Sequence, residues 1–348
     1  MPNPPGEPAT DPVRWGILST ARIARQRVVP AMLKSPSTRV TAVASRSLDN
    51  ARNFAAAFDI PKAYGSYQEL IDDPEIDAIY NALPNHLHVE TTLAAAAKGK
   101  HVLCEKPIGL DLTDALRLKA VPAGILIGEA FMIRHHPQWQ EVQKLLAAGR
   151  IGKVRAVQTF FAFLNVDPAN IRNRPETGGG AILDIGCYAI ASARLIFGAE
   201  PLRVMALIDR DPAMHTDRTT SILADFGAGR QFSATLSTQA FRYQRVGIVG
   251  SEGRIEMETP FSAPTDEKSK ILLDLHGPGQ PVETITFPPV DQYALQAEAF
   301  SRAVRGTGPW PYGLDDALAN MAVLDALFRS ERSGMWEKPE LLPAATGP

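Results

Sequence analysis

Short apolar runs alternate with amphipathic segments along the first third of the chain. The apolar runs cover residues 13–19, 39–46, 77–85 and 101–107, and helical spacing fills the stretches between them. Strands that alternate with helices at this spacing predict a parallel, doubly wound sheet. Ligands of such sheets bind outside the carboxyl ends of the strands. The residues that follow each strand are therefore the candidates for function.

The pattern changes near Ile151, where apolar and polar residues begin to alternate as they do in strands with one solvated face. A helical segment at 181–197 interrupts this alternation, and helical spacing returns at 293–303 and 314–329. The second half is predicted to be a mostly antiparallel, open-faced sheet with a helix on one face. Its predicted strands cover residues 154–166, 202–210, 218–227, 231–239, 245–258 and 270–277.

Composition narrows the class of protein. A chain of 348 residues exceeds one compact core, so two domains are expected, and 45% hydrophobic with 21% charged residues is ordinary for a globular protein. The net charge of −2, without a basic stretch, gives no support to a nucleic-acid partner. Cys104 and Cys187 show no metal or disulfide spacing, which fits a reducing compartment.

The opening of the chain and its longest apolar runs bear on where in the cell the protein is expected. The proline-rich opening lacks the apolar core of a signal peptide and is interpreted as a disordered tail. No apolar run approaches membrane-spanning length. A cytoplasmic protein without a membrane partner is expected.

The stretch WGILSTARIA follows the first predicted strand and opens a helix, where the pyrophosphate of a dinucleotide rests on backbone N–H groups. Gly16 is present, but the small residues Ser19 and Ala21 stand where the other glycines of the usual fingerprint would be. Taken alone this is any strand-to-helix turn, and the βαβ context favours a cofactor site. The candidates here are Gly16, Ser19, Thr20, Ala21, Arg22 and Ile23.

The end of the second strand bears on which dinucleotide binds. An NAD enzyme usually has an acid there that binds the ribose 2′-hydroxyl. This chain has Ser45 and Arg46, with no acid before Asp49. Both side chains can bind a 2′-phosphate, and the alternative is a surface arginine on a turn. NADP is therefore predicted, with NAD as the alternative.

Further candidates follow the third and fourth strands. The H-x-H pattern at 86–88 and the histidines at 135–136 lack an evident acidic or cysteine partner, so no metal site is predicted. A lysine in CEKP, at the mouth of the sheet, can hold the nicotinamide ribose, although most lysines are solvated surface residues. These cofactor candidates are Leu83, Pro84, Asn85, His88, Glu105, Lys106 and Pro107, together with Arg134.

The stretches WGILSTARIA, CEKP and GGGAILDIGCY, in that order, make the chain similar to the Gfo/Idh/MocA oxidoreductases over about residues 13–339. GEAFMIRHHPQ and DQYALQAEAFSRAV most resemble the branch of xylose dehydrogenase, dihydrodiol dehydrogenase and sugar ketoreductases. The resemblance implies an α/β protein with a Rossmann dinucleotide-binding domain at 13–130. A substrate-binding and oligomerisation α/β domain follows at 131–339, with the helix at 314–329 packing back on the first domain.

Asp184 and Tyr188 can point the same way from the helix at 181–197, because residues four apart share a helix face. The glycines at 178–180 are expected to let the backbone approach substrate or cofactor closely. By the resemblance, Lys106, Asp184 and Tyr188 form the catalytic set. Tyr188 would be the acid/base, its pKa lowered by Lys106 and the nicotinamide charge. The alternative is a structural aspartate beside an interface tyrosine.

The substrate is expected to contact Tyr188, Arg172 and Tyr293, although Arg172 can equally be a surface loop arginine. The expected function is NADP-dependent hydride transfer with a sugar, keto-sugar or cyclic diol. A redox-neutral lyase or glycosidase-type enzyme that returns the hydride, and a non-catalytic NADP-binding sensor, are the alternatives. A homodimer or homotetramer through the open sheet face is expected, as in relatives. The particular substrate and the direction of reaction are not readable from the sequence.

Overall fold

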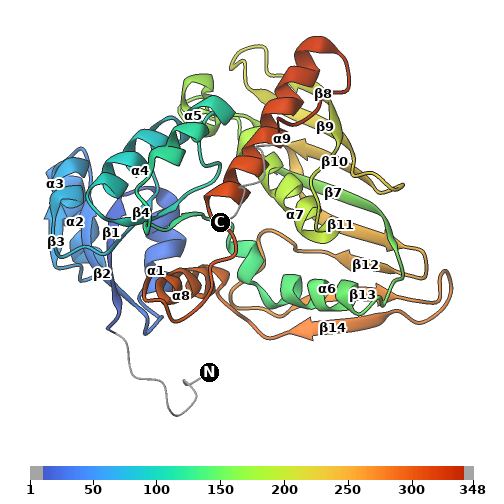
Figure 1. Cartoon of the computed structure of the whole chain (residues 1–348), viewed down its shortest axis with the longest axis horizontal. Helices are drawn as coiled ribbons and strands as arrows, with labels where there is room; N and C mark the ends of the chain where they lie inside the picture. The colour runs from blue at the N-terminus through green and yellow to red at the C-terminus, as the bar shows by residue number, and fades with distance from the viewer. Residues whose placement is uncertain (1–10, 341–348) are drawn as a thin grey trace.

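The computed structural model describes residues 11–340. Residues 1–10, which hold most of the proline-rich opening interpreted above as a disordered tail, lie outside the described residues, as do residues 341–348. Two sheets dominate the molecule, one in each half of the chain (Figure 1).

Sheet A is the parallel, doubly wound sheet predicted for the first half. Its strand order is β3-β2-β1-β4-β5-β6, and all its pairs are parallel. The chain order reverses between β1 and β4, which is where such sheets bind ligands. Two strands of three residues each, β3 and β6, were not predicted. The strands are β1 (Val13–Leu18), β2 (Thr38–Ala44), β3 (Lys62–Tyr64), β4 (Ala78–Asn81), β5 (His101–Cys104) and β6 (Ile127–Glu129).

Short helices connect the strands of sheet A, and α2, α3 and α5 begin with a side-chain cap. The Ser47 side chain accepts from the Asn50 N–H at the start of α2, and Ser66 and Glu69 form a capping box at α3. The last crossover, between β5 and β6, is made by α5 and a single helical turn at Arg117–Ala120. The helices are α1 (Val29–Met32), α2 (Leu48–Ala57), α3 (Tyr67–Asp72), α4 (His88–Ala97) and α5 (Leu112–Leu116).

Sheet B confirms the mostly antiparallel sheet predicted for the second half. Its order is β14-β13-β12-β11-β7-β10-β9-β8, and β7 with β10 is its parallel pair. The predicted run at 245–258 forms parts of two strands, and β14 was not predicted. The strands are β7 (Val154–Leu164), β8 (Arg203–Arg210), β9 (Asp217–Asp225), β10 (Gln231–Ser237), β11 (Gln239–Gly250), β12 (Arg254–Met257), β13 (Ser269–Asp274) and β14 (Glu283–Phe287).

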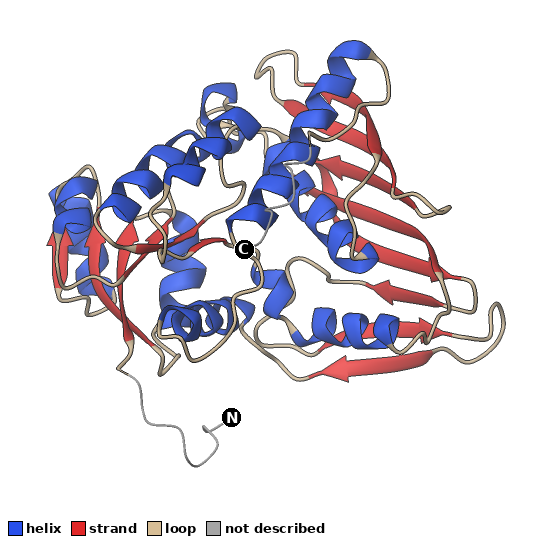
Figure 2. Ribbon diagram, viewed as in Figure 1, coloured by secondary structure: helices blue, strands red, loops and turns tan. Residues whose placement is uncertain are grey.

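Helices cover one face of sheet B, the face turned toward sheet A, and leave the other face open (Figure 2). α8 packs against α1 and β2 of the first half, whereas α9 contacts both α5 and β8. The last two helices therefore tie the two sheets together. The helices of this half are α6 (Pro137–Ala147), α7 (Cys187–Phe197), α8 (Gln292–Val304) and α9 (Leu314–Ser333).

The segment Pro175–Phe197 is long and apolar enough to cross a membrane by length and composition, contrary to the expectation that no run approached this length. In the protein, 89% of its most apolar window is buried. The segment is apolar on all sides because it lies between sheet B and α9. Its composition is that of a core helix.

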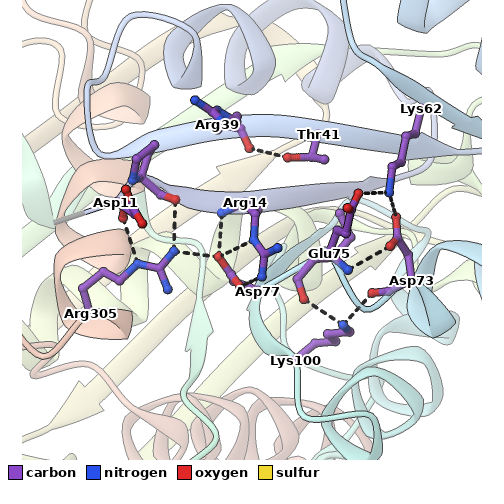
Figure 3. A network of polar contacts seen from close by, with 12 residues as sticks. Asp11, Arg14, Arg39, Thr41, Lys62, Asp73, Glu75, Asp77, Lys100 and Arg305 are labelled. Atoms are coloured by element: carbon purple, nitrogen blue, oxygen red, sulfur yellow. Dashed lines mark hydrogen bonds and ion pairs between the residues drawn. The ribbon is translucent and has the colours of Figure 1, made fainter.

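A polar network, which we call the amino-edge network, lies at the amino ends of the strands of sheet A (Figure 3). Asp77, just before β4, accepts from Arg14 of β1 at 2.6 Å and from Arg305 after α8 at 2.7 Å. Lys62 pairs with Asp73 at 2.8 Å and also contacts Glu75. These contacts tie β1, β3 and the residue after α8 to the segment between α3 and β4, at the edge of the sheet away from the expected cofactor site.

Candidate active site

Lys106 and Asp184 meet across the two halves of the molecule. The Lys106 ammonium donates to the Asp184 backbone carbonyl at 2.7 Å and to the Asp184 carboxylate at 3.0 Å. Arg172 donates to the other carboxylate oxygen at 3.0 Å. The Lys106 and Asp184 side chains are each 11% exposed. One carboxylate thus holds two cations, one from the end of β5 and one from the loop before the site helix.

Tyr188 lies beside this ion pair. The Lys106 ammonium is 5.2 Å from the centre of the Tyr188 ring. The phenol is buried against Phe131, edge-on at 5.1 Å, and against Phe161 and Phe261 at 6.1 and 5.9 Å. The Tyr188 hydroxyl donates to the Met132 thioether at 3.4 Å. The structure therefore brings Lys106, Asp184, Tyr188 and Arg172 together, as the sequence predicts.

The charges of this group follow from burial and pairing. Burial opposes the charged form of Asp184, but Arg172 and Lys106 outweigh it, so the pKa of Asp184 is lowered. Asp184 likewise raises the pKa of Lys106 against the effect of burial. Burial, followed by the charge of Glu105, raises the pKa of Tyr188 well above its ordinary value. The expected lowering of that pKa by Lys106 is therefore not found in the protein alone, where burial and the charge of Glu105 dominate.

The helix that carries Asp184 and Tyr188 begins at a cap that the sequence analysis missed. Asp217, at the start of β9, accepts from the Ile182 N–H at 2.6 Å. Any side chain at Gly180, where φ is +116°, would overlap the Asp217 carboxylate. The first turn of the helix, Ile182–Gly186, is wide and leads directly into α7. Negative charge on Asp217 also interacts favourably with the positive end of the helix dipole.

The three glycines before the helix serve contacts within the protein. A side chain at Gly178 would meet Leu110, and one at Gly179 would meet the Arg172 backbone. The interpretation that they admit substrate or cofactor is therefore replaced by close packing of this loop against its neighbours. Asn85, after β4, donates to the Gly178 carbonyl at 2.8 Å and fixes the same loop to sheet A.

A buried acid holds the turn that follows Lys106. Glu129 of β6 is 2% exposed, and its carboxyl accepts from the Ile108 N–H at 2.8 Å. Burial raises the pKa of Glu129 to about 8. Glu105, next to Lys106, accepts from the Tyr80 hydroxyl. Burial raises the pKa of Glu105 as well. Neither Glu129 nor Tyr80 carried a sequence signal beyond its place in a buried strand.

The turn after β1 suits the phosphates of a dinucleotide. Ser19 adopts φ +85°, a conformation that favours glycine, and its N–H donates to the Ala44 carbonyl at 2.9 Å. The next four candidates are at least partly exposed and lead into the helix whose first N–H groups lack partners within the helix. Gly16 instead lies inside β1, where a side chain would collide with Leu70 of α3. It is a packing glycine, and the cofactor prediction for Gly16 is corrected. The four partly or fully exposed candidates are Thr20, Ala21, Arg22 and Ile23.

The end of β2 presents an exposed cation. Arg46 is exposed, whereas Ser45 is buried, and the Ser45 hydroxyl accepts from the Ser47 N–H at 3.4 Å. Arg46 also approaches the Tyr67 phenol, where it opposes the rise of the Tyr67 pKa caused by burial. A guanidinium without an adjacent acid fits a ribose 2′-phosphate. Arg46 fits that role better than Ser45 does.

Three cofactor candidates prove to be structural. The Nδ1 atom of His88 lies 2.7 Å from the Pro107 carbonyl oxygen, and its Nε2 atom lies 2.8 Å from the Leu83 carbonyl oxygen. Burial lowers the pKa of His88 to about 4. The two carbonyl contacts oppose this lowering, because both oxygens accept from a ring N–H. His88 is thus a buried brace between two loops, and Leu83 supplies one of the carbonyls that hold it. Pro107 supplies the other.

Arg134 and Tyr293 are the remaining site candidates. The Arg134 guanidinium pairs with Asp316 of α9 and stacks 4.3 Å from the centre of the Tyr312 ring. This pairing explains its burial without a cofactor, and the cofactor prediction for Arg134 has no support from its contacts. Tyr293, in the first turn of α8, packs against the apolar cores of both halves. Burial, followed by the charge of Glu105, raises the pKa of Tyr293.

Within residues 11–340, no group of three His, Cys, Asp or Glu side chains is placed to hold a metal ion.

Two family models match the chain in succession. Residues 13–123 match the oxidoreductase family NAD-binding Rossmann fold, and residues 139–256 match the Gfo/Idh/MocA C-terminal domain. The chain belongs to the Gfo/Idh/MocA oxidoreductase family. This confirms the family that the three sequence stretches indicated.

Members of the Gfo/Idh/MocA family resemble the chain along nearly its whole length. An uncharacterised oxidoreductase of Rhizobium meliloti is 46% identical over 94% of this chain and 99% of its own. A D-xylose 1-dehydrogenase (NADP(+)) of Haloferax volcanii is 36% identical over 92% and 98%. The structure of a 3-ketoreductase from Actinomadura kijaniata, in complex with NADP and TDP-benzene, superposes with a TM-score of 0.85 at 32% identity, over 92% and 98%.

Proposed function

We propose that the chain is an NADP-dependent oxidoreductase acting on a sugar, keto-sugar or cyclic diol, with Tyr188 as its acid/base. The observation that carries the proposal is the buried Tyr188 phenol beside a lysine that a carboxylate holds in place. The names of relatives support the substrate class, since they include a xylose dehydrogenase, a keto-sugar 3-reductase and a dihydrodiol dehydrogenase.

The residues divide the work by position. A bound nicotinamide supplies or takes the hydride at the carbon of the substrate. Tyr188 exchanges a proton with the oxygen on that carbon, donating it in reduction and accepting it in oxidation. Its raised pKa keeps the phenol protonated at neutral pH, which suits donation to a carbonyl oxygen. Lys106 faces the ring and stabilises the phenolate that results.

Asp184 and Arg172 set the geometry around Lys106. Asp184 accepts from both cations, so it fixes the ammonium close to the Tyr188 ring. The Arg172 side chain is 42% exposed and its remaining N–H groups can bind substrate hydroxyls. On the cofactor side, the turn at Ser19 would hold the pyrophosphate of NADP and Arg46 its 2′-phosphate.

The decisive experiment replaces Tyr188 with phenylalanine. Tyr188→Phe should lower kcat by about 10²- to 10⁴-fold, because the proton donor is lost, while the Kd for NADPH changes little. Reduced-nicotinamide absorbance would be followed with free aldoses and cyclic diols for oxidation and with keto-sugars for reduction. Tyr64→Phe is the matched control, since the Tyr64 hydroxyl bonds to Asp73 in the amino-edge network. It should leave kcat unchanged.

The outcomes separate the alternatives. Full turnover by Tyr188→Phe would disprove the acid/base assignment. If no substrate changes the absorbance of the unmodified protein while cofactor stays tightly bound, the redox-neutral alternative replaces a net oxidoreductase. A cytoplasmic location stays a prediction from the sequence.

A second copy of the chain covers the open face of sheet B in this proposal. That face exposes Leu207, Leu223 and Val249, at 77%, 50% and 47%. Ion pairs of both signs, such as Arg203 with Asp225, lie among them, so the surface can be self-complementary. Light scattering should show a dimer or a multiple of it. The double variant Leu207→Glu with Leu223→Glu should shift it to monomer, and a monomeric parent protein at micromolar concentration would contradict the proposal.

A further inference from the structure

The Tyr188 hydroxyl is placed by a weak acceptor. It donates to the Met132 thioether at 3.4 Å, and a thioether sulfur accepts hydrogen bonds only weakly. The direction of the hydroxyl therefore depends on how firmly Met132 and the surrounding rings are held.

A buried glutamine of α8 holds Met132. Gln296 is 3% exposed, and with its amide oxygen turned toward the Phe131–Met132 turn that oxygen accepts from the Met132 N–H at 3.1 Å and from the Phe131 N–H at 3.0 Å, the latter shared with the Glu129 carbonyl at 2.9 Å. Both partners are donors, so the oxygen of the amide must face them. The same turn places the Phe131 ring edge-on against Tyr188. Gln296 therefore fixes both a wall and the hydrogen-bond acceptor of the phenol.

Two further glutamines hold Phe261, another ring that packs against Tyr188. Gln244 of β11 accepts from the Phe261 N–H at 3.0 Å, and Gln292 of α8 donates to the Phe261 carbonyl at 3.2 Å. Phe261 stacks on Phe161 at 4.6 Å and lies 5.9 Å from Tyr188. Gln292 and Gln296 are one turn apart on α8, so one helix supports both walls.

We propose that Gln296 is a positioning residue that sets the direction of the Tyr188 hydroxyl through the Phe131–Met132 turn. This inference rests on the proposed role of Tyr188 as acid/base. Gln296 reaches no reacting atom in this proposal. Its effect is geometric: a displacement of about 1 Å of a catalytic group can lower the rate by about a hundredfold.

The test compares three substitutions of glutamine. Gln296→Met keeps the length of the side chain but removes the acceptor, and it should lower kcat by about tenfold to a hundredfold, with substrate KM and NADPH Kd within about twofold. Gln296→Glu keeps an oxygen at the same place and should restore most of kcat. Gln143→Met is the matched control, because Gln143 of α6 donates to the Leu195 carbonyl at 3.1 Å, away from Tyr188. It should leave kcat unchanged.

Two further variants keep the inference falsifiable. Met132→Leu removes the sulfur acceptor with a similar volume, so it should fold and should lower kcat even if Gln296→Met does not fold. In a Tyr188→Phe background, Gln296→Met should cause no further loss, since both act through one group. An unchanged kcat in Gln296→Met or in Met132→Leu, with Tyr188→Phe inactive, would overturn the positioning role alone. Activity in Tyr188→Phe would overturn the proposed function instead.

Discussion

Strand β5 has a buried lysine at each end, and the two differ in what they bind. Lys100, before the strand, donates to the backbone carbonyls of Asp73 and Ile76, both at 2.7 Å. Lys106, after the strand, donates to the Asp184 carbonyl at 2.7 Å and carboxylate at 3.0 Å. Burial lowers the pKa of Lys100, whereas Asp184 raises the pKa of Lys106 against burial. Lys100 thus closes a loop at the amino edge of the sheet, whereas Lys106 at the carboxyl edge is a cation held in place by Asp184.

The acids and phenols of the two edges also differ in which form their surroundings favour. In the amino-edge network, hydrogen bonds from Arg14 and Arg305 overcome burial and lower the pKa of Asp77 to about 2. At the carboxyl edge, burial raises the pKa of Glu105 and Tyr188. Asp77 at the amino edge is thus held in its charged form by two guanidinium groups. At the carboxyl edge Tyr188 keeps a proton that a reaction can move, beside the Lys106–Asp184 ion pair, as an active site requires.

Exchanging each lysine for methionine tests the contrast most strongly. Lys106→Met should lower kcat at least about a hundredfold, because the phenolate of Tyr188 loses its nearby cation. Lys100→Met should leave kcat intact but cost about 1–3 kcal/mol of stability, since two buried carbonyls lose their donor. Steady-state kinetics and urea unfolding measure the two effects. A Lys100→Met enzyme with reduced kcat and normal stability would break the division between the edges.

Acid titration of stability sharpens the amino-edge side. The folded pKa of Asp77 is about 2, below its ordinary value near 4, so its contribution to the free energy of unfolding is present above pH 4. It is lost as the pH falls from about 4 to about 2, and amounts to about 2 kcal/mol. Asp77→Asn should be less stable at neutral pH and should lose less stability than the parent on acidification. Parallel acid-unfolding curves for both proteins would contradict this assignment.

A smaller effect is expected at the rim of the carboxyl edge. Arg46→Ala should raise the KM for NADPH by about tenfold to a hundredfold, as the loss of one charge-assisted bond predicts, and should leave the KM for NADH nearly unchanged. Cofactor binding followed by nicotinamide fluorescence provides the measurement. Arg52→Ala, on the exposed side of α2, is the control. Equal effects on both cofactors would show that Arg46 does not read the 2′-phosphate.

The sequence predicted the parts of the fold that follow a period. Both sheets, the site helix and the two last helices were recognised because their apolar residues repeat at strand or helix spacing. The strands β3 and β6 were missed because each has three residues, too few for any period to show. The strand β14 was missed because its exposed residues give it little apolar pattern.

The candidate site was predictable where residue types are paired along one helix or stand at a strand end. Lys106, Asp184, Tyr188 and Arg172 come together as expected. Their supports were not predictable, since Asp217, Glu129 and Gln296 act from elements far along the chain and look like ordinary strand or helix residues. Gly16 and His88 were assigned to the cofactor site because a residue type required by packing looks the same in a sequence as one required by a cofactor.

The parallel pair of β7 and β10 has a consequence for how the protein reaches its active form. The chain between these strands includes the site helix and the hairpin of β8 and β9, so closing that pair brings together residues far apart in sequence. Contacts of such long range form slowly during folding. Asp217, which anchors the helix carrying Tyr188, stands on that hairpin. Recovery of turnover during refolding should therefore coincide with completion of sheet B and lag behind the formation of sheet A.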